Sequence, residues 1–69
     1  MKISARNLLK GKVKQVQHGA VNSEIVIEIA PGVEVVSIIT KHSAEALGLK
    51  EGQDVVAIIK ASSVMVGVD

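Results

Sequence analysis

Three short polar clusters carry the residues of this chain that could do chemistry, and the first lies near the N-terminus. Ser4, Arg6 and Asn7 place a hydroxyl, a guanidinium and an amide within four consecutive positions. Apolar residues follow at once and indicate a strand, so the cluster should lie at the start of a rigid element. Arginine offers a planar fork of donors and a permanent charge, which suits oxyanions. The cluster therefore predicts part of a site for a small anion.

Two more donor clusters occupy predicted strand ends. The segment Thr40–Ser43 lies between a strand and a short helix, where its hydroxyls and the free helix amides suit an anion. The segment Lys60–Ser63 follows the next strand and adds an ammonium, two hydroxyls and exposed backbone N–H groups. Each cluster also has a purely structural explanation, because hydroxyls commonly cap helices and charged residues commonly end strands in solvent.

None of the three clusters contains a carboxylate. A set of donors without an acceptor favours an oxyanion that carries no proton at neutral pH, and molybdate, tungstate and sulfate meet that condition. Monohydrogen phosphate would leave its O–H group unpaired, which costs about 1–3 kcal/mol when the group is buried. The choice between molybdate and sulfate depends on cavity size, which these residues do not define.

Residues suited to catalysis are few and scattered. The chain has no cysteine, and its two histidines, His18 and His42, are far apart and expected at the surface. Glu24 and Glu28 share one face of a predicted strand, as solvated or interface residues commonly do. No group of histidines and carboxylates has metal-ligand spacing, and no glycine-rich phosphate loop is present. We therefore expect neither an enzyme nor a metal-cation site.

Composition limits the kinds of partner. The 69 residues predict one domain, residues 1–69, in which 48% of residues are hydrophobic, although so short a chain buries only about 60% of its unfolded surface. Without disulfides, contacts between copies are the expected stabiliser, so we predict a homo-oligomer. The absence of aromatic residues and the net charge of +1 disfavour nucleic-acid binding. With no membrane-spanning run or signal segment, we expect a cytoplasmic protein without a membrane partner.

The pattern of apolar residues predicts an all-β fold. Five strands are expected, at Leu8–Gln17, Ser23–Ala30, Val33–Thr40, Asp54–Lys60 and Ser63–Val68. The first should bulge near Lys14, where the alternation changes parity, and the fourth is apolar on both faces, as a central or interface strand is. Helical turns are predicted over Ser43–Gly48, with Thr40 or Ser43 as N-cap and Gly48 as the stop. Five strands with a short helix between the third and fourth are typical of a small OB-like barrel.

Four segments together resemble the molbindin, or Mop, domain family. Ser4–Val13 is similar to the family's SARNxLxGxV opening, and Ile38–Ser43 to its I-T-x-x-S segment. Leu47–Gly52 resembles its LGLxEG turn, and Ile59–Val66 its IKASxVM ending. The resemblance covers essentially the whole chain, including the spacing between motifs, and is greatest to the free-standing clostridial molbindins.

This resemblance implies an oxyanion-binding protein that assembles. Family members are OB-like barrels that exchange strands in dimers, and the free-standing ones form hexamers, as trimers of dimers, that bind molybdate and usually tungstate at subunit interfaces. By motif, the main site would comprise Ser4, Arg6, Lys60, Ala61 and Ser62, with Thr40 and Ser43 from the neighbouring subunit. Cations would neutralise the dianion, hydroxyls and amides would fix its oxygens, and Asn7 would stabilise the turn. The implied function is intracellular molybdate storage and homeostasis.

A second anion site and two alternative functions complete the expectations. The family has further sites near the threefold axes of the hexamer, and the candidates for such a site are His18, Gly19, Ala20, Asn22 and Ser23. No pterin cofactor is expected, because no aromatic residue is present to stack its ring. The alternatives are an OB-fold nucleic-acid-binding module and an interaction module without a specific oxyanion ligand.

Overall fold

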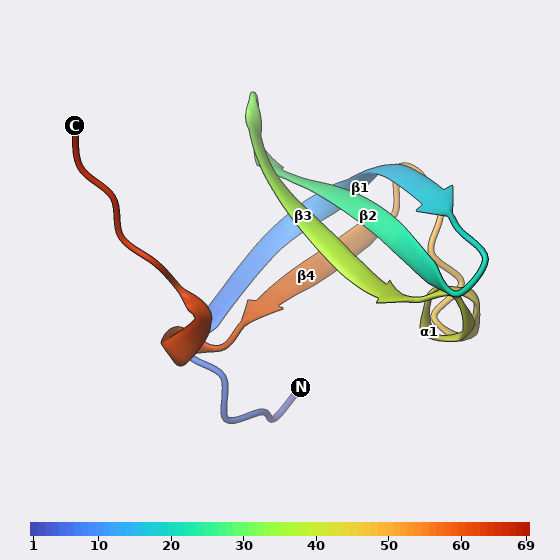
Figure 1. The fold of residues 1–69 in the computed structure, drawn as a ribbon, viewed down its shortest axis with the longest axis horizontal. Coiled ribbons are helices and arrows are strands. Elements are labelled where there is room, and N and C mark those ends of the chain that lie inside the picture. The colour runs from blue at the N-terminus through green and yellow to red at the C-terminus, as the bar shows by residue number, and fades with distance from the viewer.

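The computed structural model describes residues 1–69 and consists of one curled sheet with a short helix (Figure 1). Four antiparallel strands in the order β3-β2-β1-β4 form the sheet: β1 Asn7–His18, β2 Asn22–Ala30, β3 Val33–Thr40 and β4 Asp54–Ile59. The helix α1, Lys41–Ala46, lies between β3 and β4, and the 3-10 turn η1, Ala61–Ser63, follows β4. The prediction of an all-β, OB-like fold with one helix after the third strand is confirmed.

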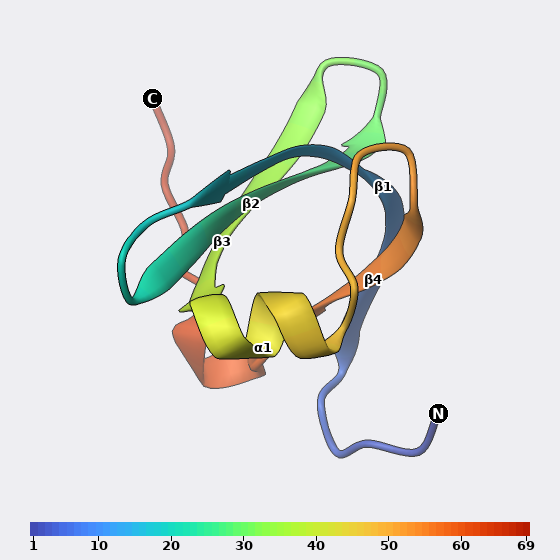
Figure 2. The same ribbon diagram turned by 90° about the vertical axis from the view of Figure 1, so that its right-hand side faces the viewer.

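β1 bends strongly because of two local features. Its register with β2 shifts between Val13 and Gln15, which makes Lys14 the extra residue of a bulge at the predicted position. At Gly11 the two strands approach so closely that an added Cβ would lie 2.5 Å from the carbonyl oxygen of Glu28, so no other residue fits without a shift. The bent strand pairs with β4 through its first half and with β2 through its second, which curls the sheet (Figure 2).

Hydrogen bonds define both ends of α1, which lies across one end of the curled sheet (Figure 2). Thr40 is the N-cap, and its Oγ1 accepts a hydrogen bond from the backbone N–H of Ser43 at 3.0 Å. Because Thr40 rather than Ser43 is the cap, the helix begins earlier than predicted. Gly48, the predicted stop, has a φ of 63°, and the N–H of Leu49 donates to the carbonyl of Ala44 in a Schellman motif. Neither helical segment is long and apolar enough to span a membrane.

The predicted fifth strand, Ser63–Val68, is wrong for this chain on its own. β4 ends at Ile59, Ala61–Ser63 form η1, and the last residues extend away from the sheet without a partner strand (Figure 1). An apolar alternating segment becomes a strand only where it pairs with a neighbouring backbone, and this segment pairs with neither edge strand, β3 or β4. Met65 and Val66 are consequently 92% and 91% exposed.

The core of one chain is small. Only seven of the 69 residues are buried, and the central apolar cluster joins β1, β2, β4 and α1 through Val13, Ile25, Ile27, Ala44 and Ala57. An apolar groove of about 660 Å³ remains between residues of β3 and β4. Of the two predicted positions for the fourth strand, central is wrong, because β4 is an edge strand. Its Ile58 is 49% exposed, as an interface residue in a free chain would be.

Candidate oxyanion site

Two of the three donor clusters meet at one end of the sheet. Asn7 and Ile59 form the terminal pair of the β1–β4 ladder, and Nδ2 of Asn7 donates to the carbonyl oxygen of Ile59 at 3.1 Å. Arg6 lies directly before β1, and Lys60 lies directly after β4. The start of β1 and the end of β4 accordingly lie side by side, and η1 follows directly (Figure 1). Pairing of the strands thus brings together residues from opposite ends of the chain.

The turn η1 adds unused backbone donors to this end of the sheet. Within the turn, the N–H groups of Ser63 and Val64 donate to the carbonyl oxygens of Lys60 and Ala61, at 2.9 and 3.3 Å. The N–H groups of Ala61 and Ser62 have no hydrogen-bond partner within the chain, and both residues are exposed. We call Ser4, Arg6, Lys60, Ala61 and Ser62 the strand-end cluster. It presents two cations, two hydroxyls and two unused amides to solvent, which are the donors that an oxyanion requires.

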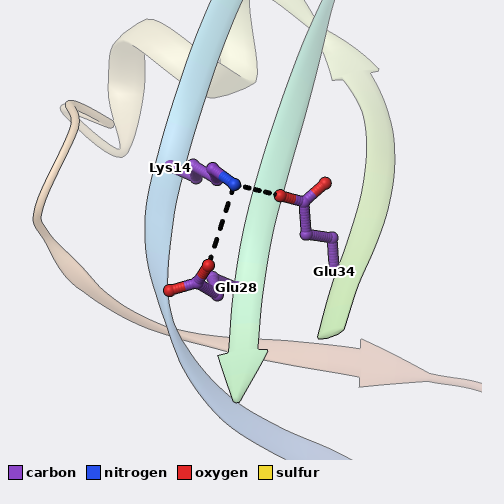
Figure 3. Close-up of polar contacts among 3 residues, drawn as sticks. All are labelled: Lys14, Glu28 and Glu34. Atoms are coloured by element: carbon purple, nitrogen blue, oxygen red, sulfur yellow. Dashed lines mark hydrogen bonds and ion pairs between the residues drawn. The ribbon is translucent and has the colours of Figure 1, made fainter. Parts of the chain in front are cut away.

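All ion pairs of the chain lie elsewhere, over the middle of the sheet. We call this set the ion-paired region: Lys12–Asp54 at 2.7 Å, Lys14–Glu28 at 3.8 Å, and Lys14–Glu34 (Figure 3). Arg6 and Lys60 have no carboxylate within 4.0 Å. Lys10, Lys41 and Lys50 are also unpaired, but Arg6 and Lys60 are the two cations that flank the Asn7–Ile59 pair.

Hydrogen bonding shifts two pKa values in the ion-paired region. The hydrogen bond from Lys12, followed by its charge, lowers the pKa of Asp54 below its ordinary value of 3.8. The hydrogen bond to Glu34, followed by the charges of Glu34 and Glu28, raises the pKa of Lys14 above 10.5. Both shifts favour the charged forms, so Asp54 and Lys14 are charged at neutral pH.

The third donor cluster lies at the opposite end of the sheet. Thr40 pairs with Asn22 in the β2–β3 ladder, at the end where β1 finishes and α1 begins. Its hydroxyl caps α1 and donates to Oγ of Ser43 at 2.8 Å. The structure therefore keeps Thr40 and Ser43 apart from Arg6 and Lys60 within one chain. The helix-cap explanation is confirmed for the hydroxyl of Thr40 but not for that of Ser43, which only accepts from Thr40. The contact of both hydroxyls with an anion stays a prediction.

The second predicted anion site coincides with the turn between β1 and β2. Nδ1 of His18 and Oγ of Ser23 lie 2.6 Å apart, and Ser23 is 1% exposed. The N–H of Gly19 donates to the carbonyl of Asn22 at 2.7 Å. A pocket of about 280 Å³ adjoins this turn, and Glu24 supplies a carboxylate to its lining. Ala20 is exposed there. Much of the donor capacity is already used within the turn, so this site stays a prediction.

Two features of the site could not be read from the clusters themselves. One is the hydrogen bond from Asn7 to Ile59, whose only signal is an amide residue at the start of a predicted strand. The other is the distribution of ion pairs, which depends on register between strands. No group of three histidine, cysteine or carboxylate residues lies close enough together to hold a metal ion.

Comparisons with known proteins agree with this architecture. The TOBE domain family model matches residues 3–66. "Molybdenum-pterin-binding protein 3" of Clostridium pasteurianum is 54% identical over 66 residues, which cover 96% of this chain and 97% of the relative. MopII from Clostridium pasteurianum, in an apo structure, superposes with a TM-score of 0.90 at 48% identity, covering 97% of this chain and 100% of MopII.

A third similar protein carries a ligand. The cytoplasmic molybdate-binding protein ModG, in a crystal structure with molybdate bound, gives a TM-score of 0.93 at 45% identity over all of this chain and 49% of the ModG chain. The family match and the high identity cover nearly the whole chain, including both ends of β1 and β4. The chain belongs to the TOBE domain family and, within it, to the Mop proteins.

Proposed function

We propose that this protein binds molybdate, and also tungstate, for intracellular storage and homeostasis. The observation that carries the proposal is the strand-end cluster, in which the Asn7–Ile59 pair places Arg6 and Lys60 together without a carboxylate partner. Relatives named for molybdenum binding, and ModG with molybdate bound, support the same ligand class. In this proposal the strand-end cluster holds the anion, with Thr40 and Ser43 completing the site.

The chemistry of the donors explains the choice of ligand. Arg6 and Lys60 neutralise the dianion, while the hydroxyls of Ser4 and Ser62 and the unused N–H groups fix its oxygens. The cations and backbone N–H groups can only donate, and the hydroxyls are the only acceptors in this set. A protonated phosphate would turn one hydroxyl into an acceptor and lose the hydrogen bond which that hydroxyl donates to a fully deprotonated oxyanion. The donor set therefore favours an unprotonated oxyanion.

The site is completed by a second copy of the chain. Thr40 and Ser43 lie at the far end of the sheet, so their contact with the same anion requires a neighbouring subunit. The open apolar groove and the exposed, apolar residues 64–68 suggest that the C-terminal segment of one copy pairs in the groove of another. We therefore propose strand-exchanged dimers that assemble into a hexamer, a trimer of dimers, with molybdate at subunit interfaces.

The proposed activity is binding without catalysis. Each chain acts as one Mop domain in the cytoplasm, and the bound species is the oxyanion rather than a metal cation. The chain contains no aromatic residue, which argues against a stacked pterin even though its relatives are named for one.

Isothermal titration of the purified oligomer tests the proposal. Molybdate and tungstate should bind tightly, and excess sulfate or phosphate should not displace them. Arg6→Ala and Lys60→Ala should each lower the molybdate affinity strongly while the oligomer persists. Lys10→Ala is the matched control, because it removes an unpaired cation of β1 that lies outside the strand-end cluster. Equal binding of all four anions, or loss of affinity in Lys10→Ala alone, would contradict the assignment.

A further inference from the structure

One side-chain hydrogen bond of this chain differs from the others in what it joins. Nδ2 of Asn7 donates to the carbonyl oxygen of Ile59, which lies 52 positions later in the sequence and belongs to another strand. The remaining hydrogen bonds between side chains and backbone, at Ser43 and at Lys50, connect residues three positions apart. The Asn7 bond is therefore the only side-chain contact to backbone that ties two strands together.

This hydrogen bond lies at the last rung of the β1–β4 ladder. Asn7 is the first residue of β1, Ile59 is the last residue of β4, and both are half-buried. Terminal rungs separate more easily than central ones, because only one side of the rung is held by further pairing. An additional bond at this rung opposes separation of the two strand ends. The carbonyl it occupies belongs to the residue directly before Lys60.

The two cations of the strand-end cluster are attached to this rung. Arg6 leaves β1 and Lys60 leaves β4 at the point where Asn7 bridges the strands. If the rung opened, the distance between these two residues would no longer be set by the sheet. An ion held by several donors loses affinity quickly when the donors are not positioned in advance.

We propose that Asn7 is a positioning residue for oxyanion binding, which holds Arg6 and Lys60 at a fixed separation without contacting the anion. The inference rests on the proposed function, since it concerns the same site. This role explains why an amide occupies position 7. Its N–H group donates to the carbonyl oxygen of Ile59, whereas an aspartate of the same shape would place a second acceptor against that oxygen.

Titration of molybdate into the full chain and its variants tests this role. Asn7→Ala should bind molybdate about tenfold more weakly, in line with the loss of residues that orient the ligands of bound ions. Asn7→Asp should bind more weakly still, because its carboxylate cannot donate to Ile59 and also repels the dianion, so Asn7→Ala, which adds no charge, decides the positioning role. In Asn7→Ala the ratio of molybdate to sulfate affinity should also fall, because both cations remain while their separation is no longer fixed.

Gln53→Ala provides the matched control. Oε1 of Gln53 accepts the N–H of Lys50 at 3.0 Å, so this variant also loses one hydrogen bond between a side-chain amide and the backbone, but beyond the other end of β4. Its melting temperature without ligand should fall as in Asn7→Ala, with molybdate affinity unchanged. Wild-type affinity in both Asn7 variants, or an equal loss in Gln53→Ala, would overturn the positioning role while leaving the proposed function intact. Failure of the wild-type protein to bind molybdate would overturn both.

Discussion

Two groups of cations along β1 and β4 have opposite surroundings. In the ion-paired region, Lys12 and Lys14 each have a carboxylate within 4.0 Å, and hydrogen bonds to those carboxylates favour the charged forms. In the strand-end cluster, Arg6 and Lys60 have none, and unused amides accompany them. With a net charge of only +1, the chain cannot attract anions through its overall field. The placement of carboxylates, rather than the number of cations, therefore decides where an anion can bind.

The largest expected effect comes from making the strand-end cluster resemble the ion-paired region. Ala61→Glu places a carboxylate beside Lys60, where it should neutralise the cation and repel a dianion. Hydrogen bonds to charged groups contribute about 1.5–3 kcal/mol, so molybdate affinity should fall roughly 10- to 100-fold. Titration calorimetry measures the change. Gln15→Glu adds the same charge at an exposed position of β1, away from all the candidate site residues, and should have no such effect.

Ligand-linked stability sharpens the same contrast. Molybdate at 100 times its dissociation constant should stabilise the assembled protein by about 2.7 kcal/mol, because it binds only the folded state. For a domain of this size, that corresponds to a rise in melting temperature of roughly 10 °C or more. Thermal unfolding by circular dichroism should show the rise in the wild type and in Lys12→Ala but not in Arg6→Ala. An unchanged melting temperature at saturating molybdate would count against the proposed function.

Gly11→Ala tests the close approach of β1 and β2, between the strand-end cluster and the ion-paired region. Alanine there would place Cβ 2.5 Å from the carbonyl oxygen of Glu28 and 2.9 Å from Cγ2 of Ile27, so β1 and β2 must move apart. Overpacking of this kind typically costs about 1–3 kcal/mol. Urea unfolding should detect the loss in Gly11→Ala. Lys10→Ala, at an exposed position one residue earlier in β1, should leave stability nearly unchanged; equal behaviour of the two variants would refute the close approach.

The smallest effect is the pH dependence of the ion-paired region. Since the folded pKa of Asp54 is lowered, its contribution to stability is present above its ordinary value of 3.8 and is lost as pH falls through the folded pKa. Since the folded pKa of Lys14 is raised, its contribution to stability is present below the ordinary value of 10.5 and is lost as pH rises through the higher folded pKa. Because these side chains are exposed, the shifts should be slight. Wild type and Asp54→Asn should differ slightly in melting temperature at pH 7 and converge at acidic pH.

Local features of the fold were predictable from the sequence because local rules determine them. The bulge at Lys14 follows from a change in apolar alternation, the cap at Thr40 from a hydroxyl before a helical segment, and the stop at Gly48 from a residue that tolerates positive φ. The strand over Ser63–Val68 was not predictable in the same way. Its apolar alternation favours a paired strand, but in the single chain the segment pairs with neither edge strand of the sheet.

The candidate site was predictable in its parts but not in its arrangement. Each donor cluster is continuous in sequence, so Arg6 and Lys60 could be identified as cations at strand ends. Their proximity depends on the register that pairs Asn7 with Ile59, and their lack of carboxylate partners depends on where Lys12 and Lys14 meet theirs. Register between distant strands is a property of tertiary structure, and no spacing within one segment encodes it.

Because Thr40 and Ser43 lie at the opposite end of the sheet, the amount of anion that the protein can hold should depend on the protein concentration. A site divided between two copies exists only in the assembled fraction, so holding capacity should rise more steeply than in proportion to the number of chains. Dilution below the assembly concentration should empty the sites without any signalling molecule. Under the proposed assembly, protein abundance would itself set the threshold at which the anion is released.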